Sequence, residues 1–214
     1  MPRGSLDIPR VLAELARERP VFHSEADFQF ALAWHIQRTR PSAAIRLEYK
    51  AAYAYRRGYL DLWVREQDAV SAIELKYFMR RLTVSVDGET YDLVDQGAAD
   101  IGRYQVLKDL AKVESIVAAQ PATRGYVVAL TNNDMYWKVL AQPRTTIDAA
   151  FRIHERAVLA GNLAWSSSAG AGTTKGIEAA IQLTNRYQAQ WRDYSVVASG
   201  PRGQFRYLLI EAAR

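Results

Sequence analysis

The chain has 214 residues, of which 49% are hydrophobic and 24% are charged, a composition typical of a folded globular protein. It contains no cysteine, which excludes disulfides and thiolate-bound zinc. The formal net charge of +5 is compatible with a polyanionic partner but does not require one. No apolar run approaches the roughly 20 residues that a membrane-spanning helix needs, and the N-terminal residues lack the apolar core of a secretory signal. We therefore expect a cytoplasmic protein without a membrane partner.

The first forty residues carry two helical patterns. One helix is expected over residues 8–19 and a second from Ser24, which acts as an N-cap, to the residue before Pro41. The second helix repeats apolar residues at helical spacing and so has one buried face: Phe28, Leu32 and Ile36.

Three strand-like runs follow, and later segments alternate between helix and strand. The runs cover 44–55, 58–64 and 70–78, and Asp87-Gly88 marks a hairpin or an irregular excursion after them. The remaining expected elements are a long helix at 95–119, a strand buried on both faces at 125–130, a helix at 144–160, a Ser/Gly-rich loop at 162–176 and antiparallel strands in the tail. This order predicts a single α/β domain over residues 1–214.

Charged residues interrupt the two central strand-like runs at three positions, Asp61, Glu74 and Lys76. A charge in a dry interior is costly unless it is paired or binds a cation. Glu74 and Lys76 share one face of their strand, because successive side chains alternate. A two-residue loop at Gln67-Asp68, or a four-residue loop at 66–69, would place Asp61 opposite Glu74, whereas an odd loop would put them on opposite faces.

Two carboxylates that face each other repel, and a hard divalent cation between them makes the arrangement favourable. Mg²⁺ is commonly held by one or two carboxylates together with waters and substrate phosphates. A lysine beside the metal can hold or deprotonate a water and stabilise charge on a phosphate. The three residues therefore favour metal-dependent hydrolysis of a phosphodiester.

Asp61 is followed, after twelve intervening residues, by Glu74-Leu75-Lys76. This pattern resembles the motif of the PD-(D/E)xK, or restriction-endonuclease-like, nuclease superfamily. The order of expected elements over 22–130 is similar to that family, and the C-terminal strands could complete its sheet. The resemblance implies an α/β/α core with a central mixed sheet flanked by helices. It also implies that Asp61 and Glu74 bind Mg²⁺ or Mn²⁺, that Lys76 is catalytic, and that Glu25 of the preceding helix joins the metal shell.

The sequence departs from the family pattern at two places. Leu60 stands where many relatives have a proline before the first aspartate. Asp100 lies four residues before Tyr104, where a DNA-end-processing subset has glutamine, and Gln96 is one turn too early. Those subfamilies are therefore less favoured.

Two glutamates compete as the additional metal ligand. Glu25 is in phase with Phe28 and so faces the core, although the helix dipole alone also favours a carboxylate at that position. Glu48 is the alternative, but Arg46 and Lys50 flank it on one face of the strand and suggest a surface ion ladder. We favour Glu25.

Basic residues interleaved with aromatic ones are expected to hold a nucleic-acid backbone, with binding that weakens as salt rises. A solvated sheet edge is the alternative for the strand-end clusters, and a tyrosine in a helix is often a packing residue. The candidates are Arg56, Arg57, Arg80, Arg81, Arg103, Tyr104 and Lys108.

The sequence thus favours a metal-dependent nuclease that acts on DNA, with RNA less favoured and a homodimer possible. One alternative is a catalytically inactive protein of the same fold that binds nucleic acid or another protein, since fold alone does not imply function. A further alternative is an ordinary sheet with a chance cluster of ions.

Overall fold

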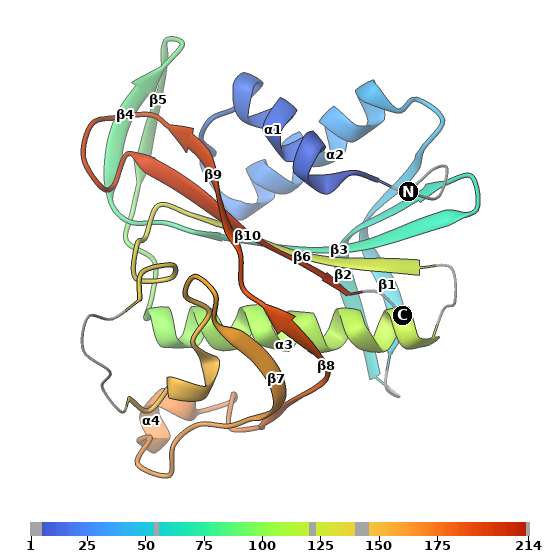
Figure 1. Cartoon of the computed structure of the whole chain (residues 1–214). Coiled ribbons are helices and arrows are strands. Elements are labelled where there is room, and N and C mark those ends of the chain that lie inside the picture. The colour runs from blue at the N-terminus through green and yellow to red at the C-terminus, as the bar shows by residue number, and fades with distance from the viewer. Residues whose placement is uncertain (1–5, 54–55, 120–122, 140–145, 213–214) are drawn as a thin grey trace.

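A central six-stranded mixed sheet organises the molecule (Figure 1). The computed structural model describes residues 6–53, 56–119, 123–139 and 146–212; the side chains of residues 52, 53, 56, 57 and 123 lie outside that description. Every neighbouring pair of strands is antiparallel except β3 and β6, which are parallel. The spatial order of the strands is β1 (Ala44–Tyr53), β2 (Arg56–Glu66), β3 (Ala69–Phe78), β6 (Thr123–Thr131), β10 (Gln204–Ala212) and β9 (Trp191–Val196).

Helices cover both faces of this sheet (Figure 1). Helices α1 (Ile8–Glu18) and α2 (Glu25–Thr39) pack together on one face, and α3 (Ala99–Ala119) packs against β6 and β3 on the other. The hydroxyl of Ser24 accepts the Asp27 backbone N–H, which is the N-cap expected for α2. The predicted α/β class, with a central mixed sheet flanked by helices, is confirmed.

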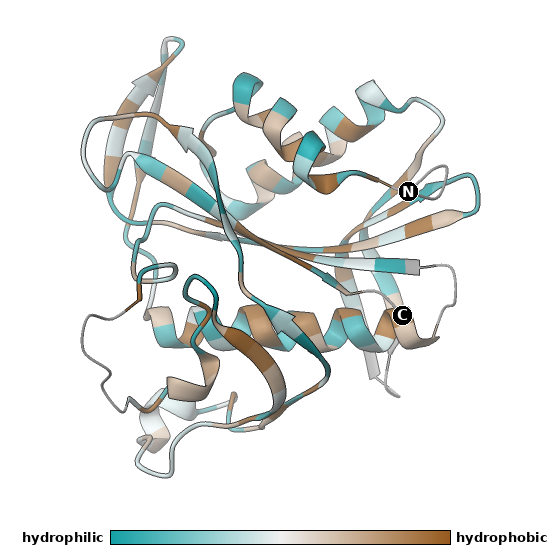
Figure 2. Ribbon diagram, in the orientation of Figure 1, coloured by the Kyte–Doolittle hydropathy of each residue, from teal (hydrophilic) through white to brown (hydrophobic). Residues whose placement is uncertain are grey.

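Two hydrophobic cores lie on the two faces of the sheet. Leu75 and Val128 belong to the core beneath α1 and α2, whereas Ala72 and Val127 belong to the core beneath α3. The central strands are hydrophobic over most of their length (Figure 2), as expected for strands buried on both faces. Gly125 permits the close approach of α3, because an added Cβ there would lie 2.0 Å from Val113.

Two hairpins extend from the main sheet. The predicted turn at Asp87-Gly88 joins β4 (Leu82–Val86) to β5 (Glu89–Leu93), and both turn residues have positive φ, as a type I′ turn requires. The second hairpin pairs β7 (Val158–Leu163) with β8 (Ile181–Gln188), and the short helix α4 (Ala171–Thr174) lies in the connection between them. The predicted loop at 162–176 therefore begins inside β7 and contains α4.

The helix predicted at 144–160 is wrong over the part that the structure describes, residues 146–160. A single 3₁₀ turn, η1 (Ala149–Phe151), is followed by a segment that turns at Glu155-Arg156 and then enters β7. Asp148 points inward to a buried arginine, and Val158 pairs with Gln188 of β8. These tertiary contacts outweigh the local helical propensity.

The predicted antiparallel strands of the tail are confirmed. Strand β10 pairs with β6 on one side and β9 on the other, both antiparallel, so the C-terminal strands complete the central sheet. Among the described residues, no helix is both long and apolar enough to cross a membrane.

Candidate functional site

The hairpin between β2 and β3 has the register that a Gln67-Asp68 loop predicts. Glu66 pairs with Ala69, and the ladder continues to Leu62 opposite Ile73. The ladder ends there, one step before Asp61 and Glu74. The expected pairing of these two residues is therefore not formed, but their carboxyl groups are close enough for the charge of Asp61 to raise the pKa of Glu74.

Strand β2 no longer pairs with β3 beyond Leu62 and Ile73. Beyond this point, polar side chains form hydrogen bonds with the β3 backbone. Asp61 Oδ2 accepts the Leu75 N–H at 2.6 Å, and Glu25 Oε2 accepts the Tyr77 N–H at 2.8 Å. Lys76 Nζ donates to the Leu75 carbonyl at 2.8 Å. The predicted site residues therefore stabilise the edge of β3 at the point where its partner strand departs.

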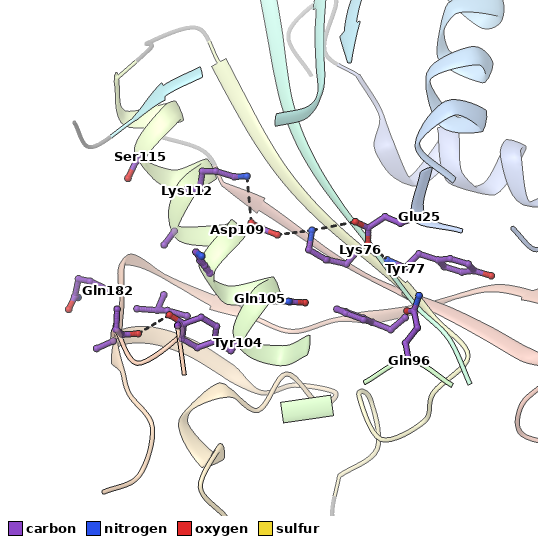
Figure 3. Close-up of a pocket in the computed structure, with 17 residues that line it drawn as sticks. Glu25, Lys76, Tyr77, Gln96, Tyr104, Gln105, Asp109, Lys112, Ser115 and Gln182 are labelled. Atoms are coloured by element: carbon purple, nitrogen blue, oxygen red, sulfur yellow. Dashed lines mark hydrogen bonds and ion pairs between the residues drawn. The ribbon is translucent and has the colours of Figure 1, made fainter. Parts of the chain in front are cut away.

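Helix α3 adds two charged residues, Asp109 and Lys112, that the sequence analysis missed (Figure 3). Lys76 Nζ lies 3.0 Å from Asp109 Oδ2 and 3.8 Å from Glu25 Oε1. Lys112 Nζ lies 3.6 Å from Asp109 Oδ1 and 2.5 Å from Glu74 Oε1. An alternating chain of charges therefore runs from α2 across β3 to α3. An Asp and a Lys three residues apart in a helix are too common to have signalled this role.

We refer to these residues as the site cluster: Glu25, Asp61, Glu74, Lys76, Asp109 and Lys112. It contains four carboxylates and two ammonium groups, so its formal charge is −2 when every group is ionised.

Two carboxyl groups of the cluster, those of Asp61 and Glu74, are difficult to ionise. Burial raises the pKa of Asp61 to about 6, although the Leu75 N–H and the Lys76 ammonium act in the opposite direction. Burial, together with the charges of Asp109 and Asp61, raises the pKa of Glu74 to about 8 despite the contact with Lys112. Burial lowers the pKa of Lys76, but its acidic neighbours outweigh that effect and raise the pKa above its usual value. Lys76 is therefore an ammonium ion at neutral pH.

Two buried oxygens of the cluster each contact a lysine ammonium group: Glu74 Oε1 contacts Lys112 and Asp109 Oδ2 contacts Lys76. These ion pairs offset part of the cost of burying the two carboxylates. A metal ion at either oxygen would have to displace the ammonium group or share the oxygen with it. Within the described residues, no three His, Cys, Asp or Glu side chains are grouped so that they could hold a metal between them. Mg²⁺ needs only one or two carboxylates alongside water and phosphate, so Asp61 and Glu74 still fit that ion.

A cleft of about 1100 Å³ opens beside the site cluster. Lys76, Asp109 and Lys112 form part of its wall, and Gly176 and residues 179–182 form another part (Figure 3). Lys108, which is exposed, also lines it. The cleft gives solutes access to charged groups of the site cluster.

The predicted nucleic-acid contacts are distributed unevenly around this cleft. The side chains of Arg56 and Arg57 lie outside the described part of the structure. Arg80 is half-buried and lies 3.2 Å from Asp95, and Arg81 is exposed. Neither Arg80 nor Arg81 belongs to the residues that line the cleft.

The three candidates on α3 differ from one another. Arg103 is 3% exposed; its guanidinium lies 2.5 Å from Asp148 and donates to the Met135 carbonyl, so this arrangement assigns it a structural role instead of a phosphate contact. Tyr104 is buried, and its hydroxyl donates to the Ala179 carbonyl. Lys108 alone of the three has an exposed side chain.

Glu48, the alternative metal ligand, is exposed and linked to the site indirectly. Gln29 Nε2 donates both to Glu48 Oε1 at 2.9 Å and to the Asp61 carbonyl at 2.8 Å. Glu25, by contrast, contacts Lys76 and the β3 backbone directly. The geometry therefore favours Glu25 over Glu48 as a member of the site.

No protein-family model matches the sequence, and no curated protein or solved structure is significantly similar to the chain.

Proposed function

We propose that this chain is a metal-dependent nuclease of the PD-(D/E)xK type that hydrolyses phosphodiester bonds of DNA, with RNA a less favoured substrate. The observation that carries the proposal is the site cluster itself. Lys76 lines an open cleft, and Asp61 and Glu74 lie in the same cluster of charges. The pKa values of both carboxyl groups are raised, chiefly because the groups are buried, and acidic neighbours add to the effect. Perturbed groups of this kind concentrate at functional sites.

The chain topology supports the proposed family. Helix α2 precedes the antiparallel meander β1–β2–β3, and α3 then leads to β6, which pairs in parallel with β3. The resemblance implies this order of elements for a restriction-endonuclease-like core. The β4–β5 hairpin is then an insertion between β3 and α3.

Each residue would have a defined role in hydrolysis. Asp61 and Glu74 would hold Mg²⁺ or Mn²⁺, with Glu25 as a further ligand, and the ion would supply Lewis acidity and a more acidic bound water. Lys76 stays protonated because of Asp109 and Glu25, so it stabilises negative charge on the phosphate and orients water instead of removing a proton.

The test is an incubation with supercoiled, linear and single-stranded DNA and a structured RNA, in Mg²⁺ or Mn²⁺, with EDTA as the blank. Cleavage is expected in the wild type and should fall by about 10²–10⁴-fold or more in Asp61→Ala, Glu74→Ala and Lys76→Ala. Glu211→Gln is the matched control, because this exposed carboxylate pairs with Arg124 on β6. Cleavage that persists in the three site variants would contradict the proposal.

A catalytically inactive module that binds nucleic acid or protein is the second candidate, and one observation favours it. Asp61 and Glu25 accept β3 backbone N–H groups, and Glu74 contacts Lys112, so these carboxylates already have partners without a metal. A divalent ion that raises the Tm of the wild type but not of Glu74→Ala would favour the nuclease. Equal Tm values with and without the ion would favour the inactive module.

A further inference from the structure

Lys112 already contacts the Glu74 carboxylate, which a metal cation would need as a ligand. Its Nζ lies 2.5 Å from Glu74 Oε1, and it also donates to the Tyr59 carbonyl at 3.0 Å. The side chains of Lys112 and Glu74 are only 14% and 3% exposed. An ammonium group at this position repels a divalent ion and blocks the oxygen at the same time.

Lys112 is also one of the residues that line the cleft. Lys108, one turn earlier on α3, lines that cleft as well, and residues four apart lie on the same side of a helix. Asp109 contacts both Lys112 and Lys76, so it can keep the Lys112 side chain close to the site when Glu74 no longer holds it.

We propose that Lys112 is a substrate-binding residue that neutralises Glu74 in the resting site, is displaced from it by the divalent cation, and then binds a phosphate of the nucleic-acid strand in the cleft. This inference rests on the proposed function, because it requires a cation at Glu74. Lys112 therefore has two anionic partners in succession, Glu74 before the cation binds and a phosphate afterwards. Lys108 contributes to the second of these states only.

Two consequences of opposite sign separate this role from a structural one. Removing the ammonium frees Glu74 for the cation, so Lys112→Met should bind Mn²⁺ more tightly, by about tenfold if the lost contact has the strength of a charged hydrogen bond. Removing a phosphate contact should weaken binding of a single-stranded DNA oligonucleotide and reduce the slope of log K against log salt by about 0.7. Damage to the fold would instead weaken the binding of both Mn²⁺ and the oligonucleotide.

The experiment measures Mn²⁺ affinity by calorimetry in the wild type, Lys112→Met, Lys108→Met and Lys138→Met. The last is a control for loss of a lysine charge, since Lys138 is exposed and pairs with Asp134. Oligonucleotide affinity is then measured with Mn²⁺ present in a Lys76→Ala background, which suppresses cleavage. Lys112→Met should change both affinities in opposite directions, Lys108→Met should weaken only the oligonucleotide, and Lys138→Met should change neither.

The outcomes distinguish this inference from the proposed function. Equal Mn²⁺ affinity in the wild type and Lys112→Met would overturn the displacement of Lys112 while leaving the metal site intact. Tighter Mn²⁺ binding with unchanged oligonucleotide affinity would overturn the phosphate contact. No Mn²⁺ binding by any variant would overturn the proposed metal site, and this inference with it.

Discussion

Two buried carboxylates of this protein, Asp148 and Glu74, have opposite surroundings. Asp148 accepts a hydrogen bond from the Thr146 hydroxyl at 2.6 Å and lies 2.5 Å from Arg103 and 3.2 Å from Arg152. Burial alone would raise the pKa of Asp148, but these three partners together hold it below its usual value. This carboxylate is fully compensated.

Glu74 is undercompensated by comparison. It lies among other acidic groups, Asp61 and Asp109, and its contact with Lys112 does not prevent its pKa from rising to about 8. Since Asp148 and Glu74 are both buried, burial of a charged side chain does not by itself indicate a functional role. Charges that hold a fold together are matched by their neighbours, whereas an undercompensated cluster beside a cleft is suited to an additional cation.

Stability measurements should separate the two carboxylates most clearly. Asp148→Ala leaves the buried Arg103 without its partner and should lower the free energy of unfolding by about 3–5 kcal/mol. Glu74→Gln resembles the protonated form that the raised pKa favours, so it should cost less than about 1 kcal/mol at pH 7 without metal. Urea unfolding of both variants measures the difference. Equal losses would make Glu74 a structural ion and remove the contrast.

The pH dependence of metal binding should sharpen the contrast. The pKa values of Asp61 and Glu74 in the folded protein, about 6 and about 8, lie above those of unfolded carboxyl groups. The folded state therefore binds more protons in that range, and without metal these groups reduce stability as the pH rises. A cation prefers the ionised groups, so the increase in Tm caused by Mg²⁺ should grow from roughly pH 6 to pH 8.5. An increase that stays constant or shrinks over this range would show that these carboxyls do not hold the ion.

The smallest effect is expected at Tyr104, which lies beside the cleft without belonging to the site cluster. Tyr104→Phe removes the hydrogen bond to the Ala179 carbonyl and should cost about 1 kcal/mol of stability. Cleavage should change by less than about twofold, because the hydroxyl is committed to the backbone. Thermal unfolding and the cleavage assay check the two parts, and a large loss of cleavage without a loss of stability would place Tyr104 in the catalytic site.

Local patterns were sufficient to predict the elements that form the site. The period-two pattern and the short polar loop at Gln67-Asp68 predict the register of the β2–β3 hairpin, which the structure follows from Glu66 opposite Ala69 to Leu62 opposite Ile73. Glu25 could be placed by its phase with the apolar face of α2. These inferences depend only on residues close together in the chain.

Contacts between distant segments could not be predicted in this way. Asp109 and Lys112 reach the site because α3 packs over β3, a docking that no local pattern specifies. The sequence predicts a nucleic-acid contact for Arg103, because its local pattern does not reveal the ion pair with Asp148, which lies far along the chain. The same long-range pair helps to explain why residues 146–160 do not form the predicted helix.

Direct measurement of cation binding tests the central proposal, that the site cluster binds one divalent ion. Mn²⁺ would be titrated by calorimetry into the wild type, Glu74→Gln and the control Glu211→Gln, whose exposed carboxylate pairs with Arg124. The wild type and Glu211→Gln should each bind a single ion, and Glu74→Gln should bind none. Absence of binding in the wild type, or equal binding in Glu74→Gln, would contradict the proposal.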